Sequence, residues 1–228
     1  MNILALDTAT MSCSAAALVE GRLAAEIVDV SGETHSRHLM SMVDRVVEMT
    51  LGKVSGFDGF AVTCGPGSFT GLRIGISAIK GLAAATGKPV VGVSSLRTLA
   101  EQIPDTPHVI CTLLDARRGE VYAAGFRYRN GRVVSIRPEA ALSPEAAVDG
   151  ISDSCLLVGD GARVYRERLE QILGAKAVFA PPSCHAIRAS TVAFLALDGF
   201  RNGAQVDPAA LVPVYLRESY ADKRRWTG

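Results

Sequence analysis

The sequence predicts an α/β protein with two similar lobes, each a mixed sheet with helices packed on it. Two observations carry this prediction. Short apolar runs alternate with stretches of helical spacing along the 228 residues, which is typical of α/β folds. The opening pattern also returns in the second half of the chain. Leu6-Asp7 matches Leu114-Asp115, and Glu20-Gly21-Arg22 matches Asn130-Gly131-Arg132, which indicates a duplicated β-β-β-α unit.

The first copy is expected to open with three strands, the last two joined by a two-residue turn at Glu20-Gly21. An amphipathic helix follows, because Leu39, Val43 and Val46 recur with helical spacing. Gly87 is expected to close a second helix. The expected elements are strands Ile3–Leu6, Cys13–Val19, Leu23–Val30, Phe57–Cys64 and Pro89–Val93, and helices Ser36–Leu51, Thr70–Thr86 and Ser94–Gln102.

The second copy is expected after the break Ile103-Pro104-Asp105-Thr106-Pro107. Its expected elements are strands Val109–Leu114, Glu120–Tyr128, Arg132–Ile136, Cys155–Val158 and Ala177–Phe179, and helices Ser143–Val148, Ala162–Leu173 and Ile187–Arg201. Ser143 and Pro144 are typical of a helix start. The predicted lobes are residues 1–103 and 104–186, with a C-terminal helical segment at about 187–217 that packs back on the first lobe.

The composition excludes several classes of function. Lys plus Arg number 24 and Asp plus Glu number 23, a net charge of +1, whereas a protein that binds nucleic acid unaided usually carries a basic excess. No apolar run approaches the ~18–20 residues that a membrane span needs. The first residues also lack the basic region of a signal peptide. We therefore expect a cytoplasmic protein without membrane contact.

The metal-ligating residue types are few and scattered. The five cysteines are widely spaced and form no CxxC pair, so buried reduced thiols are expected. His35 and His38 lie three residues apart, with only Glu33 nearby as a further ligand. Polar contacts at a helix end therefore explain the two histidines better than a metal site does.

Three strand-to-loop segments suggest a cleft that once bound a nucleotide. Asp7 and Thr8 follow the first strand, and Gly65, Gly67 and Ser68 lie in a glycine-rich turn before a helix. Such a turn exposes backbone N–H groups that can bind an anion. The third segment is Gly159-Asp160-Gly161. The alternative for Asp7 is an Asx turn, in which the carboxylate bonds to its own backbone. The alternative for Gly159-Asp160-Gly161 is a tight turn between a strand and a helix.

The helix after the glycine-rich turn has one nearly bare face. Gly71, Gly75 and Ala78 lie at i, i+4 and i+7, although each helical Gly costs about 1 kcal/mol relative to Ala. Such a face allows another backbone to approach closely. The sequence leaves two partners open for it, the chain's own sheet or a helix of another protein.

Together these stretches resemble the TsaB (YeaZ) family, a branch of the actin, sugar-kinase and heat-shock-ATPase superfamily. The specific match is the signature Gly65-Pro66-Gly67-Ser68-Phe69-Thr70-Gly71-Leu72-Arg73-Ile74-Gly75. Leu4–Thr10, Thr34–Leu39, Asp115–Tyr122 and Pro213–Arg217 are similar to further family segments. The resemblance implies a duplicated ribonuclease-H-like fold.

The resemblance also implies a role in tRNA modification. TsaB-like proteins pair with the catalytic homologue TsaD and the ATPase TsaE, which transfer a threonylcarbamoyl group to the adenosine beside the anticodon. Ser95 and Leu99 stand where TsaD-like chains carry two metal-binding histidines, and Leu cannot ligate a metal. A non-catalytic scaffold is therefore expected. It would have no intrinsic cofactor, and ATP or ADP would bind weakly or only in complex with partners.

The resemblance further implies that the first two helices bind TsaD, or a second copy of the chain when TsaD is missing. The interface residues expected on this basis are Leu39, Val43, Val46, Gly71, Leu72, Gly75, Ile76 and Ile79. Two alternatives are a self-sufficient ATPase or kinase and a metalloprotease. Contact with tRNA is expected through the complex, and the basic tail Lys223-Arg224-Arg225 beside Trp226 is the local exception to the neutral charge.

Overall fold

The computed structural model describes residues 1–32 and 35–217, except for the side chains of His35 and Ser36. The basic tail at Lys223–Arg225 and Trp226 lies outside the described residues, as do the side chain of His35 and the segment Glu33–Thr34. In the part that is described, no helix combines the length and apolar character needed to cross a membrane.

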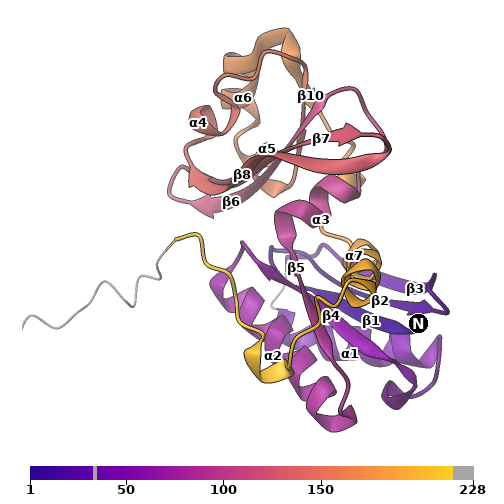
Figure 1. The fold of residues 1–228 in the computed structure, drawn as a ribbon. Helices are drawn as coiled ribbons and strands as arrows, with labels where there is room; N and C mark the ends of the chain where they lie inside the picture. The colour runs from indigo at the N-terminus through magenta and orange to yellow at the C-terminus, as the bar shows by residue number, and fades with distance from the viewer. Residues whose placement is uncertain (33–34, 218–228) are drawn as a thin grey trace, which may run out of the picture.

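Two five-stranded sheets have the same topology (Figure 1). Sheet one has the order β3-β2-β1-β4-β5, and sheet two the order β8-β7-β6-β9-β10, so each places its first strand in the centre. In both, the first three strands are antiparallel, and the fourth and fifth run parallel to the first. The predicted α/β duplication is therefore confirmed. The strands are β1 Ile3–Asp7, β2 Cys13–Val19, β3 Arg22–Asp29, β4 Gly59–Gly65, β5 Val90–Ser94, β6 Val109–Arg117, β7 Glu120–Arg129, β8 Arg132–Leu142, β9 Cys155–Val158 and β10 Ala177–Phe179.

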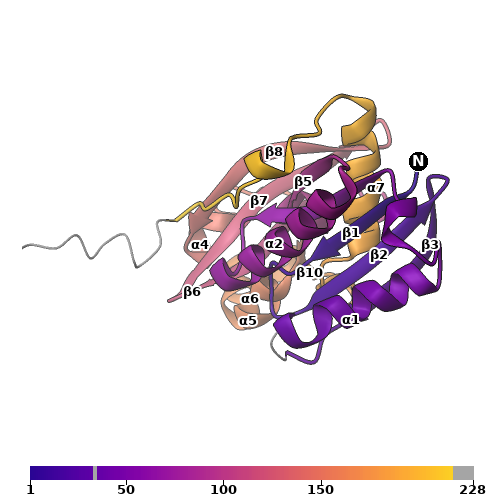
Figure 2. The ribbon, with the colours of Figure 1, turned by 90° about the horizontal axis from the view of Figure 1, so that it is seen from below.

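Helices cover both faces of sheet one, which explains why β1 is apolar from Ile3 to Leu6. Side chains alternate along a strand, so Leu4 and Leu6 pack with α1 (His35–Glu48) and α2 (Phe69–Thr86). Ile3 and Ala5 point to the other face, under α7 (Ala189–Arg201). Figure 2 shows α1 and α2 side by side on their face of the sheet.

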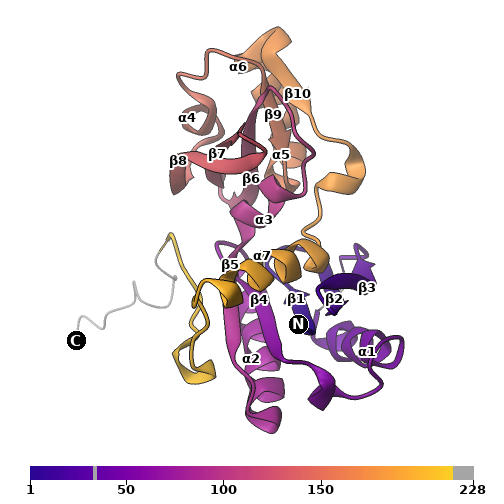
Figure 3. The same ribbon diagram turned by 45° about the vertical axis from the view of Figure 1, so that its right-hand side comes forward.

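Sheet two packs α4 (Pro144–Val148), α5 (Asp160–Val164) and α6 (Arg166–Leu173) on one face. The short helix α3 (Ser95–Glu101) lies between the two sheets (Figure 3). The expected single helix over 162–173 is wrong, because the backbone leaves helical geometry at Tyr165. The lobe limits at residues 103 and 186 stay predictions, although α7 does pack on sheet one.

The expectation of a helical segment across 187–217 is corrected by the structure. The helix α7 ends at Arg201, because Asn202 is not helical and Gly203 has a positive φ of 74°. Val206 then forms a bridge to Val90. Residues 211–217, which we call the C-terminal strap, run alongside α2 (Figure 3). The N–H of Val214 donates to the carbonyl oxygen of Cys64 over 2.7 Å.

Candidate functional site

A cavity of about 560 Å³ lies between the two lobes. Loops from both sheets meet there: the β1–β2 loop and the start of α2 from the first lobe, and the β6–β7 turn and the start of α5 from the second. The strap closes one side of the cavity. Its lining residues are Ala9, Thr10, Met11, Gly67, Ser68, Phe69, Thr70, Leu114, Asp115, Ala116, Arg117, Arg118, Tyr122, Asp160, Tyr215 and Arg217.

Three of the predicted cleft residues, Gly67, Ser68 and Asp160, line this cavity. The other five, Asp7, Thr8, Gly65, Gly159 and Gly161, do not. They belong to the segments that carry the lining residues and make contacts within the fold. The Thr8 hydroxyl, for example, donates to the carbonyl oxygen of Gly71 over 2.7 Å.

Asp7 is fully buried at the end of β1. Its Oδ1 accepts hydrogen bonds from the Thr63 hydroxyl at 2.6 Å and the Ala9 N–H at 3.2 Å. Its Oδ2 has no hydrogen-bond partner. Burial raises the pKa of Asp7 to about 7, and the nearby charge of Asp160 adds to the increase. Asp7 is therefore protonated below about pH 7, where an ordinary Asp carboxyl is already ionised.

The loop after Asp7 is closed by the glycine-rich turn. The N–H of Ser68 donates to the carbonyl oxygen of Ala9 over 2.7 Å. A Cβ at Gly67 would overlap that same oxygen, so only glycine permits this approach. The Ser68 hydroxyl in turn accepts from the N–H of Gly71 and caps α2. The N–H of Ser68 is therefore not available to a phosphate group.

Two acidic residues of the second lobe face the cavity. Asp160 accepts a hydrogen bond from the N–H of Asp115 over 3.0 Å, and burial raises its pKa. The Asp115 carboxylate accepts from the Tyr165 hydroxyl at 3.2 Å and pairs with Arg117 at 3.3 Å. Among the described residues, no group of three or more His, Cys, Asp or Glu side chains is placed to hold a metal ion.

The turn that carries Asp160 is held from behind by His185. This buried imidazole accepts from the N–H of Gly159 through Nδ1 at 3.1 Å, and its Nε2 lies 3.0 Å from the carbonyl oxygen of Ala180. Burial lowers the pKa of His185. Gly159 has a φ of 108°, and a Cβ there would overlap the carbonyl oxygen of Leu113. The glycine in this turn is therefore structural.

The rim of the cavity carries arginine and aromatic side chains that sequence reasoning did not assign to it. Arg117, Arg118 and Arg217 are lining residues, and Arg217 pairs with Glu120 over 2.7 Å. Tyr215 of the strap stacks on Phe69 with ring centroids 4.8 Å apart. The sequence offered little evidence for these residues, because the strap shows no regular spacing of apolar residues that would predict a helix or a strand.

The predicted interface residues are not on the surface, and this prediction is corrected. All eight, Leu39, Val43, Val46, Gly71, Leu72, Gly75, Ile76 and Ile79, are buried within the chain. The apolar side chains pack on sheet one, as the apolar face of an amphipathic helix generally does. A Cβ at Gly71 or Gly75 would overlap Thr8. Of the two partners left open for the bare helix face, the chain's own fold is the correct one.

A second small-residue stripe lies on the outer face of α2. Thr70, Ser77, Gly81 and Ala84 recur at helical spacing and are exposed, and a Cβ at Gly81 would meet no atom within 4 Å. On the neighbouring α1, Met40 is 45% exposed, and Met49, the residue after the end of α1, is 56% exposed. We call these six residues the outer face of α1 and α2.

Ser95 and Leu99 are fully buried on α3. Leu99 packs in the apolar cluster between the sheets, and the Ser95 hydroxyl has no hydrogen-bond partner. Neither side chain lines the cavity.

Comparisons with known proteins agree with this architecture. The family model described as "TsaD: tRNA N6-adenosine threonylcarbamoyltransferase" matches residues 29–224. The chain is 31% identical to the tRNA threonylcarbamoyladenosine biosynthesis protein TsaB of Escherichia coli, over 98% of each chain.

Solved structures show the same relationship. YeaZ from Pseudomonas aeruginosa superposes with a TM-score of 0.81 at 32% identity, over 94% of this chain and 99% of that one. The activator of 2-hydroxyisocaproyl-CoA dehydratase from Clostridium difficile has a TM-score of 0.52 at 12% identity, over 90% and 97%. At that identity the likeness shows the fold alone. On the full-length match in sequence and structure, the chain belongs to the TsaB (YeaZ) family.

Proposed function

We propose that this chain is a non-catalytic subunit of the machinery that places a threonylcarbamoyl group on the adenosine beside the anticodon of tRNA. Its full-length similarity to proteins named for tRNA threonylcarbamoyladenosine biosynthesis supports the pathway. The observation that carries the non-catalytic role is the pair Ser95 and Leu99, buried where the family resemblance places metal-binding histidines in TsaD-like chains. A buried Leu offers no atom to a metal.

Reconstitution tests this role most directly. Purified TsaD-like and TsaE-like proteins, tRNA, ATP and the threonylcarbamoyl donor system are combined with and without this chain. We expect modified adenosine only when the chain is present, and none from the chain alone. Modification by the chain without the TsaD-like protein would contradict the proposal.

The partner surface that we propose is the outer face of α1 and α2. Its residues project away from the chain's own core. The bare stripe lets a helix of another chain approach closely, and the exposed methionines supply apolar contact. We propose a TsaD-like protein as the partner there, and a second copy of this chain when that protein is missing.

Arginine substitutions on this stripe test the interface without disturbing the fold. In Gly81→Arg and Ser77→Arg the new side chain extends from an exposed helix position into the space a partner helix would occupy. Ala146→Arg on α4, an exposed small-to-arginine change in the second lobe, is the control. We expect both α2 variants to lose the TsaD-like partner in size-exclusion chromatography while Ala146→Arg retains it. Equal complex formation by all three would contradict this interface.

The cavity supports a weaker proposal, that ATP or ADP binds there weakly or only in complex with partners. The arginine rim suits phosphate groups. The loop amide at Ser68 is already bonded to Ala9, and Asp7 is buried below the lining, so the residues present do not fit a tightly bound Mg–nucleotide. The competing function, a self-sufficient ATPase or kinase, requires strong Mg–ATP binding with turnover. Calorimetric titration and a phosphate-release assay on the isolated chain distinguish the two.

We also propose that tRNA contacts the complex mainly through the partners, because the chain is nearly neutral. We propose that the protein acts in the cytoplasm, together with the tRNA. Removal of residues 223–225 tests whether the basic tail contributes. If it does, tRNA affinity of the complex falls and its salt dependence becomes less steep.

A further inference from the structure

Within residues 1–32 and 35–217, the backbone passes between the two sheets at two places (Figure 3). The first crossing, residues 102–108, leads from α3 to β6. The second, residues 180–188, leads from β10 back to α7. In a two-lobed protein such crossings are where a hinge would bend, since a hinge is a few residues that absorb the backbone rotation. The contacts of these residues therefore decide whether the lobes can move.

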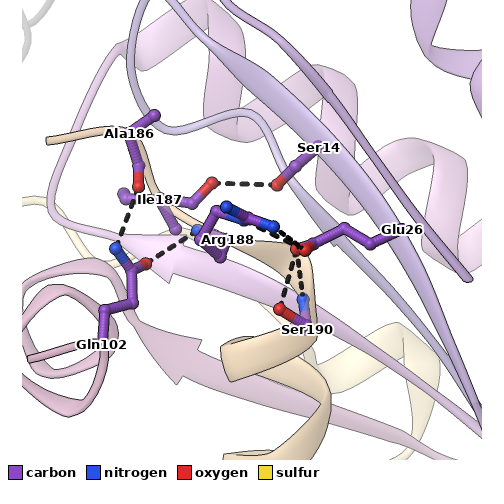
Figure 4. A network of polar contacts seen from close by, with 7 residues as sticks. All are labelled: Ser14, Glu26, Gln102, Ala186, Ile187, Arg188 and Ser190. Carbon is purple, nitrogen blue, oxygen red and sulfur yellow. Dashed lines mark hydrogen bonds and ion pairs between the residues drawn. The ribbon is translucent and has the colours of Figure 1, made fainter. Parts of the chain in front are cut away.

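Gln102 ties the two crossings together. Its side-chain Nε2 donates to the carbonyl oxygens of Ala186 at 2.9 Å and Cys184 at 3.3 Å. Its Oε1 accepts from the N–H of Arg188 at 2.7 Å. One amide group on the first crossing therefore binds three backbone groups of the second, as Figure 4 shows for Ala186 and Arg188. Rotation of either crossing alone would break these bonds.

The second crossing is also fixed to sheet one. Glu26 of β3 accepts from the guanidinium of Arg188, and from both the N–H and the hydroxyl of Ser190 at 2.9 and 2.8 Å. The Ser14 hydroxyl of β2 donates to the carbonyl oxygen of Ile187 over 3.0 Å (Figure 4). The Glu26 side chain is only 6% exposed, whereas that of Arg188 is 43% exposed, so water competes least for the bonds between Glu26 and Ser190.

Both crossings are also bonded to the second lobe. His185 contacts Gly159 and Ala180 through its two ring nitrogens. The Tyr128 hydroxyl of β7 donates to the carbonyl oxygen of Ile103 over 2.6 Å. The second crossing is thus anchored to both lobes by side-chain hydrogen bonds. The first crossing is anchored to the second lobe at Ile103 and, through Gln102, to the second crossing. No part of residues 102–103 or 184–188 is left to bend without losing one of them.

A shared apolar core adds to this restraint. One continuous cluster includes Ile3 and Val91 of sheet one, Leu99 of α3, and Ile110 and Leu156 of sheet two. Hinge closure usually proceeds around a ligand in an open cleft, but here the lobes are joined by close-packed side chains that do not deform continuously. The side-chain hydrogen bonds at the crossings and the shared apolar cluster both oppose a change in the angle between the two lobes.

We propose that the two lobes form one rigid body, with Gln102 and the Glu26–Arg188 pair as the clasp that fixes the angle between them. The width of the cavity between the lobes is then fixed by the clasp and does not change when a ligand binds in the cavity. The protein presents a fixed shape to its partners and does not close around a ligand. This inference goes beyond the proposed function and does not depend on it.

Residual dipolar couplings of the backbone N–H groups test the proposal on the full chain. The couplings of sheet one and sheet two are fitted separately to alignment tensors. For a rigid body, the two lobes give tensors of equal magnitude and of the relative orientation in the structure. Unequal magnitudes in the native protein would overturn the proposal, because they report motion between the lobes.

The clasp is tested by Gln102→Met, which keeps the length of the side chain and removes its hydrogen bonds. Gln171→Met on the exposed surface of α6 is the matched control. In Gln102→Met we expect the alignment tensor of one lobe to become smaller than that of the other. In Gln171→Met we expect the two tensors to stay equal in magnitude. Glu26→Gln, which removes the charge from the second anchor, gives the same decrease if Gln102→Met does not fold. Equal alignment of the lobes in the folded clasp variants would show that Gln102 and Glu26 do not fix the angle.

Discussion

At the scale of single residues, folding changes the chemistry of Asp7 more than its place in a turn suggests. The carboxylate has one satisfied oxygen and one buried oxygen without a partner. Its pKa of about 7 lies well above the ordinary value of 3.8. Between those two pH values the folded chain holds a proton that the unfolded chain has released. Stability is therefore greatest at low pH in this window and falls as the pH rises toward 7.

We predict that Asp7→Asn removes this pH dependence. The amide keeps an oxygen to accept from Thr63 and Ala9, and it cannot ionise. Three pKa units correspond to about 4 kcal/mol at most, so the stability of Asp7→Asn relative to the native chain should rise from about pH 4 to about pH 7 and level off above it. The buried NH₂ group adds a constant penalty of about 1–3 kcal/mol. Thermal unfolding of both proteins across that range measures the difference, and a pH-independent difference would refute the assigned protonation of Asp7.

At the scale of elements, α2 is bare on two faces for two different reasons. Gly71 and Gly75 make room for Thr8 of the chain's own β1–β2 loop. Ser77, Gly81 and Ala84 face outward. The spacing of apolar residues predicts which face of a helix is buried only when one face is apolar and the opposite face is polar. With small residues around most of α2, the sequence indicated a close contact but not which face made it.

A matched pair of substitutions separates the two faces. In Gly75→Ala the new methyl overlaps the Thr8 hydroxyl and presses on Val62, so we expect a loss of about 1–3 kcal/mol in the free energy of unfolding. In Gly81→Ala the methyl meets open space, and the helix propensity of Ala adds about 0.5–1 kcal/mol. Chemical denaturation of both variants gives the two values. If Gly81→Ala destabilises the chain as much as Gly75→Ala, the assignment of faces is wrong.

At the scale of the whole molecule, the duplication was predictable from the sequence because each lobe repeats the same local signals. Leu6-Asp7 end β1, and Leu114-Asp115 lie near the end of β6, the equivalent central strand. Gly87 does end α2 in the left-handed conformation. The strap was not predictable. Tyr215 meets Phe69, and Arg217 meets Glu120, and such contacts between distant residues leave no local pattern. The cavity rim was missed for the same reason.

The fold also determines how the molecule unfolds. Because one apolar cluster includes residues of both sheets, we predict a single cooperative transition, with calorimetric and van't Hoff enthalpies in agreement. Leu157, fully buried on β9, belongs to a separate cluster inside the second lobe. Leu157→Ala should lower stability by about 2–5 kcal/mol.

The same variant shows whether the lobes unfold together. Since the shared cluster links them, Leu157→Ala should reduce amide-exchange protection in β1 and β4 of the first lobe as much as in β6 and β9 of the second. Hydrogen exchange followed by mass spectrometry measures both lobes in one experiment. Protection retained in β1 and β4 while β6 and β9 lose it would mean that the lobes are separate folding units, because an independent first lobe is insensitive to a cavity in the second.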